Sequence, residues 1–162
     1  MEGKNHPTDY FVDGSASVTP IDEPTRQGAL VDMTAPMKGQ VKSARRTIVV
    51  LEDGTLQVTD VIEALPGLDC PLEWRMLTKA KAAVASDGVR LSANGKARNL
   101  SASASDGDVK ITYQVQAPGI PESWTDEFTY YQKMKNRSFA VWSATVPAGK
   151  TVTFVTTLTL NK

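Results

Sequence analysis

The sequence predicts an all-β protein, a two-layer antiparallel β-sandwich of about ten strands. From residue 29 onward, short runs of alternating apolar and polar residues follow one another, as in strands with one buried face. Turn sequences separate these runs, among them Glu-Asp-Gly at 52–54 and Asn-Gly at 94–95. A helical period occurs only in the alanine-rich stretch 78–85, which is too short to be stable alone. Many short strands at regular spacing are typical of sandwiches.

Residues 1–27 are predicted to form an irregular N-terminal strap or linker, and residues 28–162 the sandwich domain. Gly14, Pro20 and Pro24 lie in the first segment among small polar residues. Such residues break regular structure, so no strand is expected before residue 29.

Residues 45–60, "RRTIVVLEDGTLQVTD", predict a β-hairpin around the turn at 52–54. Both arms carry apolar residues on both faces, which is typical of a central hairpin covered on each side. We assign Ile48 and Val58 to the core. An aspartate at either position is therefore expected to unfold the domain, because it would bury an unpaired charge.

The remaining strands follow in order along the chain. In residues 71–77, Leu72, Trp74 and Met76 alternate with charged residues and are expected to point inward. In the last strand, Val152 and Phe154 have the same role. The strands are expected at 29–34, 71–77, in three runs within 82–103, and at 108–116, 126–134, 137–146 and 151–160.

The charge balance argues against a general nucleic-acid binder. Lys plus Arg and Asp plus Glu number 18 each, so the formal net charge is zero, whereas phosphate recognition needs an excess of basic residues. Arg45 and Arg46 are adjacent, so a strand directs them to opposite faces, and we interpret them as a solvated pair. No apolar run approaches the ~20 residues that span a membrane, and the N-terminus lacks the apolar segment of a secretory signal.

Groups that could perform catalysis are sparse. His6 is the only histidine and Cys70 the only cysteine, so the chain can build neither an intrachain disulfide nor a zinc site of several such ligands. We interpret Cys70 as a buried apolar residue, "PAGKT" at 147–151 as a plain turn, and the acidic residues as solvated. No cofactor or metal is expected, and the chain alone is not expected to be an enzyme.

Aromatic residues between 124 and 142 are the remaining candidates for ligand contacts. Exposed Trp and Tyr side chains can stack on sugar rings, so Trp124, Tyr130 and Tyr131 are candidate carbohydrate-binding residues. Core packing is the alternative, above all for Tyr130. Trp124 is expected in a loop, where binding residues are more frequent.

The order of the strand motifs resembles the C-terminal β-sandwich of heparinase II/III-like polysaccharide lyases over residues 28–160. The motifs are "GALVDMTAPM", "ARRTIVVLEDGTLQVTDVIEA", "LEWRMLTKA", "VRLSANGKARNL" and "ATVPAGKTVTFVTTLTL". The resemblance implies a bacterial parent enzyme with an α/α toroid and a central β-sandwich upstream. Such an enzyme is periplasmic or secreted and cleaves glycosaminoglycans or related uronates by β-elimination.

By the same resemblance, His6 and Tyr10 are the only positions that could inherit a catalytic role. Pro7 follows His6, and the asparagine or glutamine of the family pattern is missing, so catalysis is not assigned to them. The expected partners are the upstream lyase domains and an acidic polysaccharide, with neither nucleic acid nor membrane.

Three functions therefore remain open at this point. The chain is an accessory lyase domain, a free-standing carbohydrate-binding module, or a purely structural interaction domain.

Overall fold

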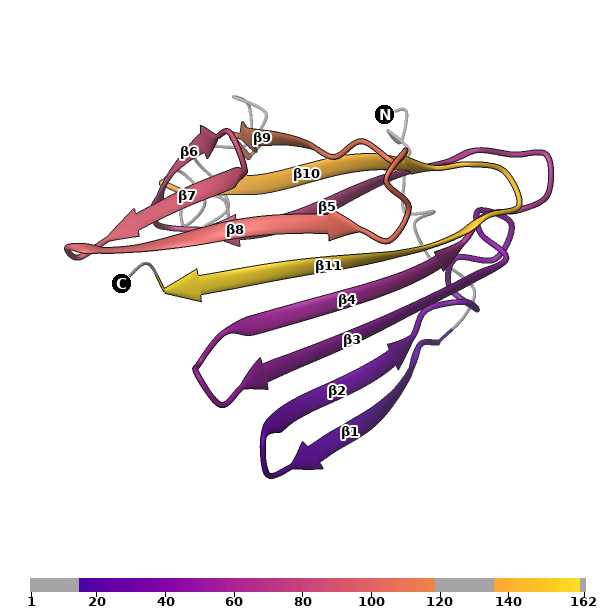
Figure 1. Cartoon of the computed structure of the whole chain (residues 1–162), viewed down its shortest axis with the longest axis horizontal. Coiled ribbons are helices and arrows are strands. Elements are labelled where there is room, and N and C mark those ends of the chain that lie inside the picture. Colours follow the sequence, from indigo (N-terminus) through magenta and orange to yellow (C-terminus); the bar gives the residue numbers. More distant parts are fainter. Residues whose placement is uncertain (1–14, 119–135, 161–162) are drawn as a thin grey trace, which may run out of the picture.

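The computed structural model describes residues 15–118 and 136–160, which form two antiparallel β-sheets (Figure 1). Eleven strands are present in these residues, which confirms the predicted all-β sandwich of about ten strands. The described residues include no helix, and hence none that could cross a bilayer. The strand expected at 126–134 lies outside the described residues.

The larger sheet has eight strands in the order β1-β2-β3-β4-β11-β8-β7-β6. Its strands are β1 (Ser17–Glu23), β2 (Arg26–Asp32), β3 (Ser43–Leu51), β4 (Leu56–Glu63), β6 (Lys81–Ala85), β7 (Gly88–Ala93), β8 (Lys96–Ala104) and β11 (Thr151–Leu160). The last of these strands therefore lies in the middle of the sheet, between β4 and β8 (Figure 1).

The smaller sheet has three strands in the order β5-β10-β9. These are β5 (Cys70–Thr78), β9 (Thr112–Gln116) and β10 (Ser138–Val146). Leu72, Trp74 and Met76 of β5 pack against the core, as their alternation predicts.

The predicted irregular strap is wrong for residues 17–27. Residues 17–23 form β1, and β2 starts at Arg26, so the two make a hairpin at the edge of the larger sheet. Pro20 is tolerated because β1 is an edge strand, where a missing backbone N–H need not break the ladder. The proposed division at residue 27 therefore falls within β2.

The alanine-rich stretch 78–85 is not helical either. Thr78 ends β5, and residues 81–85 form the edge strand β6, paired with β7. Alanine favours a helix, but pairing with an existing sheet overrides a preference of this size. The adjoining meander is confirmed, and its Asn94-Gly95 turn has positive φ values of 51° and 73°, as an Asn-Gly hairpin turn requires.

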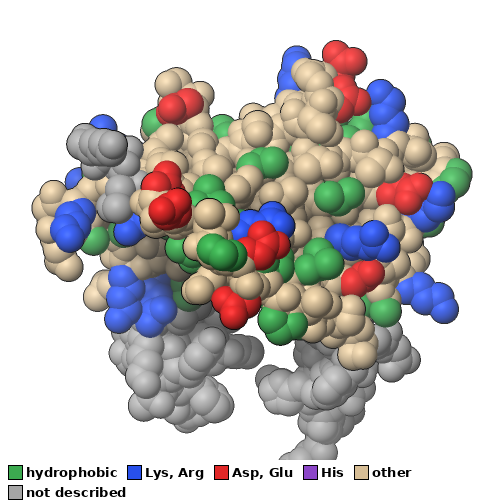
Figure 2. Space-filling model, turned by 60° about the horizontal axis from the view of Figure 1, so that its bottom comes forward, with side chains coloured by type: hydrophobic (Ala, Val, Ile, Leu, Met, Phe, Trp, Pro, Cys, Tyr) green, Lys and Arg blue, Asp and Glu red, His purple; other side chains and the backbone are tan. Residues whose placement is uncertain are grey.

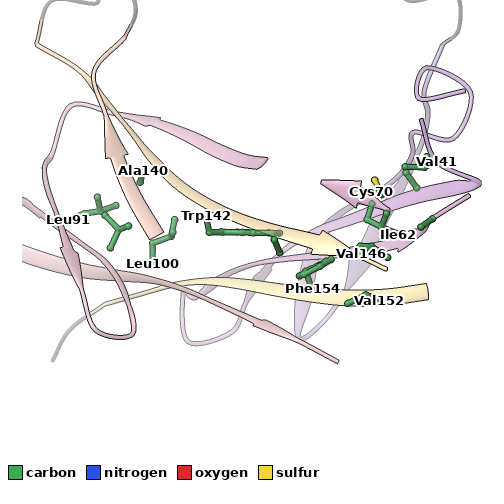
Figure 3. Packing of buried hydrophobic residues seen from close by; sticks show 14 residues of the cluster. Val41, Ile62, Cys70, Leu91, Leu100, Ala140, Trp142, Val146, Val152 and Phe154 are labelled. Atoms are coloured by element: carbon green, nitrogen blue, oxygen red, sulfur yellow. The ribbon is translucent and has the colours of Figure 1, made fainter. Parts of the chain in front are cut away.

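The core lies between the two sheets and is centred on Trp142 and Phe154 (Figure 3). Trp142 stacks against Phe154 with ring centroids 5.1 Å apart and against Trp74 at 6.4 Å. The indole N–H of Trp142 donates a 2.9 Å hydrogen bond to Thr156 Oγ1. The buried tryptophan is thus satisfied, because its single donor has a partner within the core.

Candidate functional site

The residues to which the sequence assigned binding or catalysis are not placed by the structure. His6, Tyr10, Trp124, Tyr130 and Tyr131 all lie outside the described residues. Their roles stay predictions. A candidate site must therefore be built from residues 15–118 and 136–160 alone.

Within those ranges, the ionisable side chains form no cluster that suits a metal ion. No group of three or more His, Cys, Asp or Glu residues has the required proximity there. Cys70 is buried, as predicted, and its burial raises the pKa of the thiol, which disfavours the nucleophilic thiolate. The stretch 147–151 is confirmed as a turn between β10 and β11, with Gly149 at a φ of 70°.

Arg45 and Arg46 point to opposite faces of β3, as expected, but they are not a solvated pair. Arg45 is exposed and lies 3.4 Å from Asp32. Arg46 is on the inner face and donates two hydrogen bonds to Asp60, of 2.7 and 3.1 Å. Asp60 is 3% exposed, so Arg46 neutralises a buried carboxylate. The sequence could have indicated this pair, because the predicted hairpin places Arg46 and Asp60 directly across from each other on neighbouring strands.

A cavity of about 140 Å³ opens beside this ion pair, at the rim of the sandwich. Its apolar wall comes from Met33, Met37, Ile62, Leu72, Trp74 and Trp142. Arg46, Asp60 and Glu73 supply its polar wall. The cavity has the size of one side chain, and the two charges of the ion pair cancel each other within it.

A wider and more open groove of about 610 Å³ lies over one end of the smaller sheet. Glu73, Asp108 and Lys110 are among its lining residues. Hydrogen bonds from Arg75, and a smaller contribution from Gln116, lower the pKa of Glu73, so this carboxylate is ionised and already engaged. The pKa of Glu73 is thus lowered, whereas a general acid requires a raised one.

The smaller sheet covers the inner face of the larger sheet near β11 but not near β1. Along one row of paired residues, exposure rises from 2% at Thr156 to 6% at Val58 and 37% at Ile48. Along the next row it rises from 0% at Phe154 to 63% at Val18. Figure 1 shows the reason, since β5, β9 and β10 lie at the other end of the larger sheet from β1 and β2.

We call this region the uncovered face. It consists of apolar side chains on the inner face of three neighbouring strands, namely Val18, Pro20, Ala29, Val31, Ile48 and Val50. Val50 is 50% exposed although its β4 neighbour, Leu56, is half-buried. The uncovered face is thus a direct extension of the core, made of the same residue types on the same face of the same sheet.

Positively and negatively charged side chains are mixed on the side of the molecule shown in Figure 2. Lys and Arg side chains lie beside Asp and Glu side chains there, and hydrophobic side chains stand singly among the others. Ion pairs such as Lys42–Glu63 and Arg26–Glu23 agree with this mixture. The described part of that side therefore offers no basic patch for a phosphate backbone.

Comparison with known proteins agrees with the predicted resemblance at the level of the fold. No protein-family model and no curated protein sequence matches the chain. Among solved structures, it is similar to heparinase III with a TM-score of 0.62 at 11% identity. The same values apply to heparinase III with methylated lysines. The match covers 91% of this chain, but only 22% of heparinase III and 21% of the form with methylated lysines. This chain thus has the fold of a heparinase III part and spans about a fifth of that protein.

Proposed function

We propose that this chain is a non-catalytic accessory β-sandwich of a larger, heparinase II/III-like polysaccharide lyase. The single observation that carries the proposal is the coverage, because nearly all of this chain superposes on a small part of heparinase III. The sparse chemistry of the described residues agrees with it. The accessory domain packs on the central domain of the parent enzyme and contributes to the wall of its polysaccharide groove.

The parent enzyme, by this proposal, degrades an acidic polysaccharide by β-elimination and acts in the periplasm or outside the cell. The groups that move protons belong to its other domains. The chain described here supplies packing surface and, at most, contacts to the glycan.

The test compares the chain alone with the full gene product on acidic glycosaminoglycans, by absorbance of the unsaturated product. We expect turnover by the full gene product and none by the chain. Elimination catalysed by residues 1–162 alone would refute the proposal. Affinity electrophoresis on the same glycans provides a second measurement. Retardation of the chain that Trp124→Ala abolishes would instead support the free-standing carbohydrate-binding module.

A further inference from the structure

We infer that the uncovered face is the docking surface for another folded domain of the same polypeptide. The inference rests on the proposed function, because that function assigns the chain to a larger protein. It goes further by naming the residues that form the contact and the chemistry of the surface they accept.

Burial decreases along the paired rows of the larger sheet towards β1. Ile48 and Val58 are cross-strand neighbours, yet Ile48 is 37% exposed and Val58 only 6%. Nothing in their chemistry distinguishes them, and the difference comes from where the smaller sheet ends. Neighbouring exposed apolar side chains that continue a core are typical of an interface rather than of a solvated face.

The chemistry of the uncovered face limits which partner surface it can accept. Gln27 and Asp22 lie in the row of Val50, at the rim of this face. Among the described residues, its other charges belong to Arg46 and Asp60, which neutralise each other. A partner with a charged surface would lose solvation there without gaining a counter-charge. The matching surface is therefore apolar and uncharged, like the inner face of another β-sheet. The cavity beside the ion pair has room for one apolar side chain from it.

The inferred partner is part of the same polypeptide. β1 is the first described strand and also the outer border of the uncovered face. A preceding domain would be joined to the described fold through residues 1–14 and β1, the strand that borders this face. Heparinase III, which shares the fold, is about five times longer than the matched part, so most of that protein lies outside the shared region.

The experiment is cysteine labelling by a maleimide reagent in two proteins, the 162-residue chain and the full gene product. Val50→Cys places a thiol on the uncovered face. Leu68→Cys, in the loop between β4 and β5, is a matched control because the two native side chains are 50% and 53% exposed. Native Cys70 is 6% exposed and should react slowly in both proteins.

We expect Val50→Cys to react about tenfold more slowly in the full gene product than in the chain, since a closed interface must open before labelling. Leu68→Cys should react at similar rates in both. Equal rates for Val50→Cys would overturn the inference, and so would a full gene product without a further domain. Protection that appears in the chain alone as its concentration rises would also overturn it, because the partner would then be a second copy.

The outcome is independent of the activity assay. Protection of Val50→Cys in a full gene product without lyase activity would leave the interface standing and remove the proposed function. Lyase activity of the full gene product without protection of Val50→Cys would support the proposed function and remove the inferred interface.

Discussion

Arg46 and Asp60 form a bidentate ion pair across β3 and β4, with Arg46 Nε 2.7 Å from Asp60 Oδ1. The side chain of Asp60 is 5% exposed and that of Arg46 is 32% exposed. The carboxylate is thus almost entirely removed from water, while its partner reaches the surface at the uncovered face. The pair lies at the boundary between the core, which the smaller sheet covers, and the uncovered face.

The first prediction concerns this pair. Arg46→Met should lower the free energy of unfolding by roughly 2–4 kcal/mol, because it leaves Asp60 buried and uncompensated. Urea denaturation at neutral pH measures the change.

The control is Arg45→Met on the opposite face, whose exposed ion pair with Asp32 should contribute less than about 1 kcal/mol. In the double variant Arg46→Met with Asp60→Leu, most of the lost stability should return. Equal losses for the single and double variants would mean that the charge of Asp60 is not the cause.

The second prediction separates two neighbours that the sequence treated alike. Val58→Asp should destabilise the chain by several kcal/mol, because the charge enters a buried position. Ile48→Asp should change the melting temperature far less in the isolated chain, because Ile48 is 37% exposed. The sequence-based assignment of Ile48 to the core is therefore wrong, whereas that of Val58 is confirmed. Thermal unfolding by circular dichroism distinguishes the two outcomes, and equal losses would mean that Ile48 is covered in solution.

A third prediction concerns the close approach of β7 to β8. A Cβ atom at Gly88 would lie 2.2 Å from the carbonyl oxygen of Leu100, so Gly88→Ala must shift one of the two strands. We expect a loss of about 2 kcal/mol or more, as for other overpacked sites. Gly107→Ala is the control, since a Cβ there meets nothing within 4 Å. A Gly88→Ala chain as stable as the Gly107→Ala chain would contradict this packing.

The fourth prediction is a pH dependence at Asp32. Hydrogen bonds from Thr34, with a smaller contribution from Arg45, hold the pKa of Asp32 below its ordinary value of 3.8. On acidification, Asp32 therefore takes up its proton at a higher pH in the unfolded chain than in the folded chain. The stabilisation of the folded state by the ionised Asp32 is complete above the ordinary pKa and is lost as the pH falls through the lower, folded-state pKa.

The melting temperature of the wild type should accordingly exceed that of Asp32→Asn at neutral pH, and the difference should shrink in acid below the ordinary value of 3.8. Asp87→Asn, in the turn between β6 and β7, controls for the loss of one negative charge. A difference in melting temperature between wild type and Asp32→Asn that grows on acidification would contradict this prediction.

Most of the fold could be predicted because strand periodicity and turn residues are local signals. The Asn94-Gly95 turn and the inward set Leu72, Trp74 and Met76 are read from neighbouring residues alone. The β1–β2 hairpin was missed because an edge strand exposed on both faces needs no alternation, and Pro20 imitates a breaker. For residues 81–85, the pairing partner rather than the composition decides the structure.

The uncovered face could not be predicted, because burial depends on how far the opposing sheet extends. Ile48 and Val58 have the same residue character and the same place in their hairpin, and only the position of the smaller sheet separates them. The ion pair of Arg46 and Asp60 was within reach, since the register of a hairpin around residues 52–54 brings the two together. The predicted roles of Trp124, Tyr130 and Tyr131 stay predictions.

The position of β11 has a consequence for biosynthesis. Within the larger sheet, only β11 joins the strands β1–β4 to the strands β6–β8, yet it is the last described strand to leave the ribosome. Until Thr151–Leu160 emerges, β4 and β8 both present open edges that can pair with other chains. The larger sheet therefore closes only after β11 has been synthesised, and this one strand hides both edges at once.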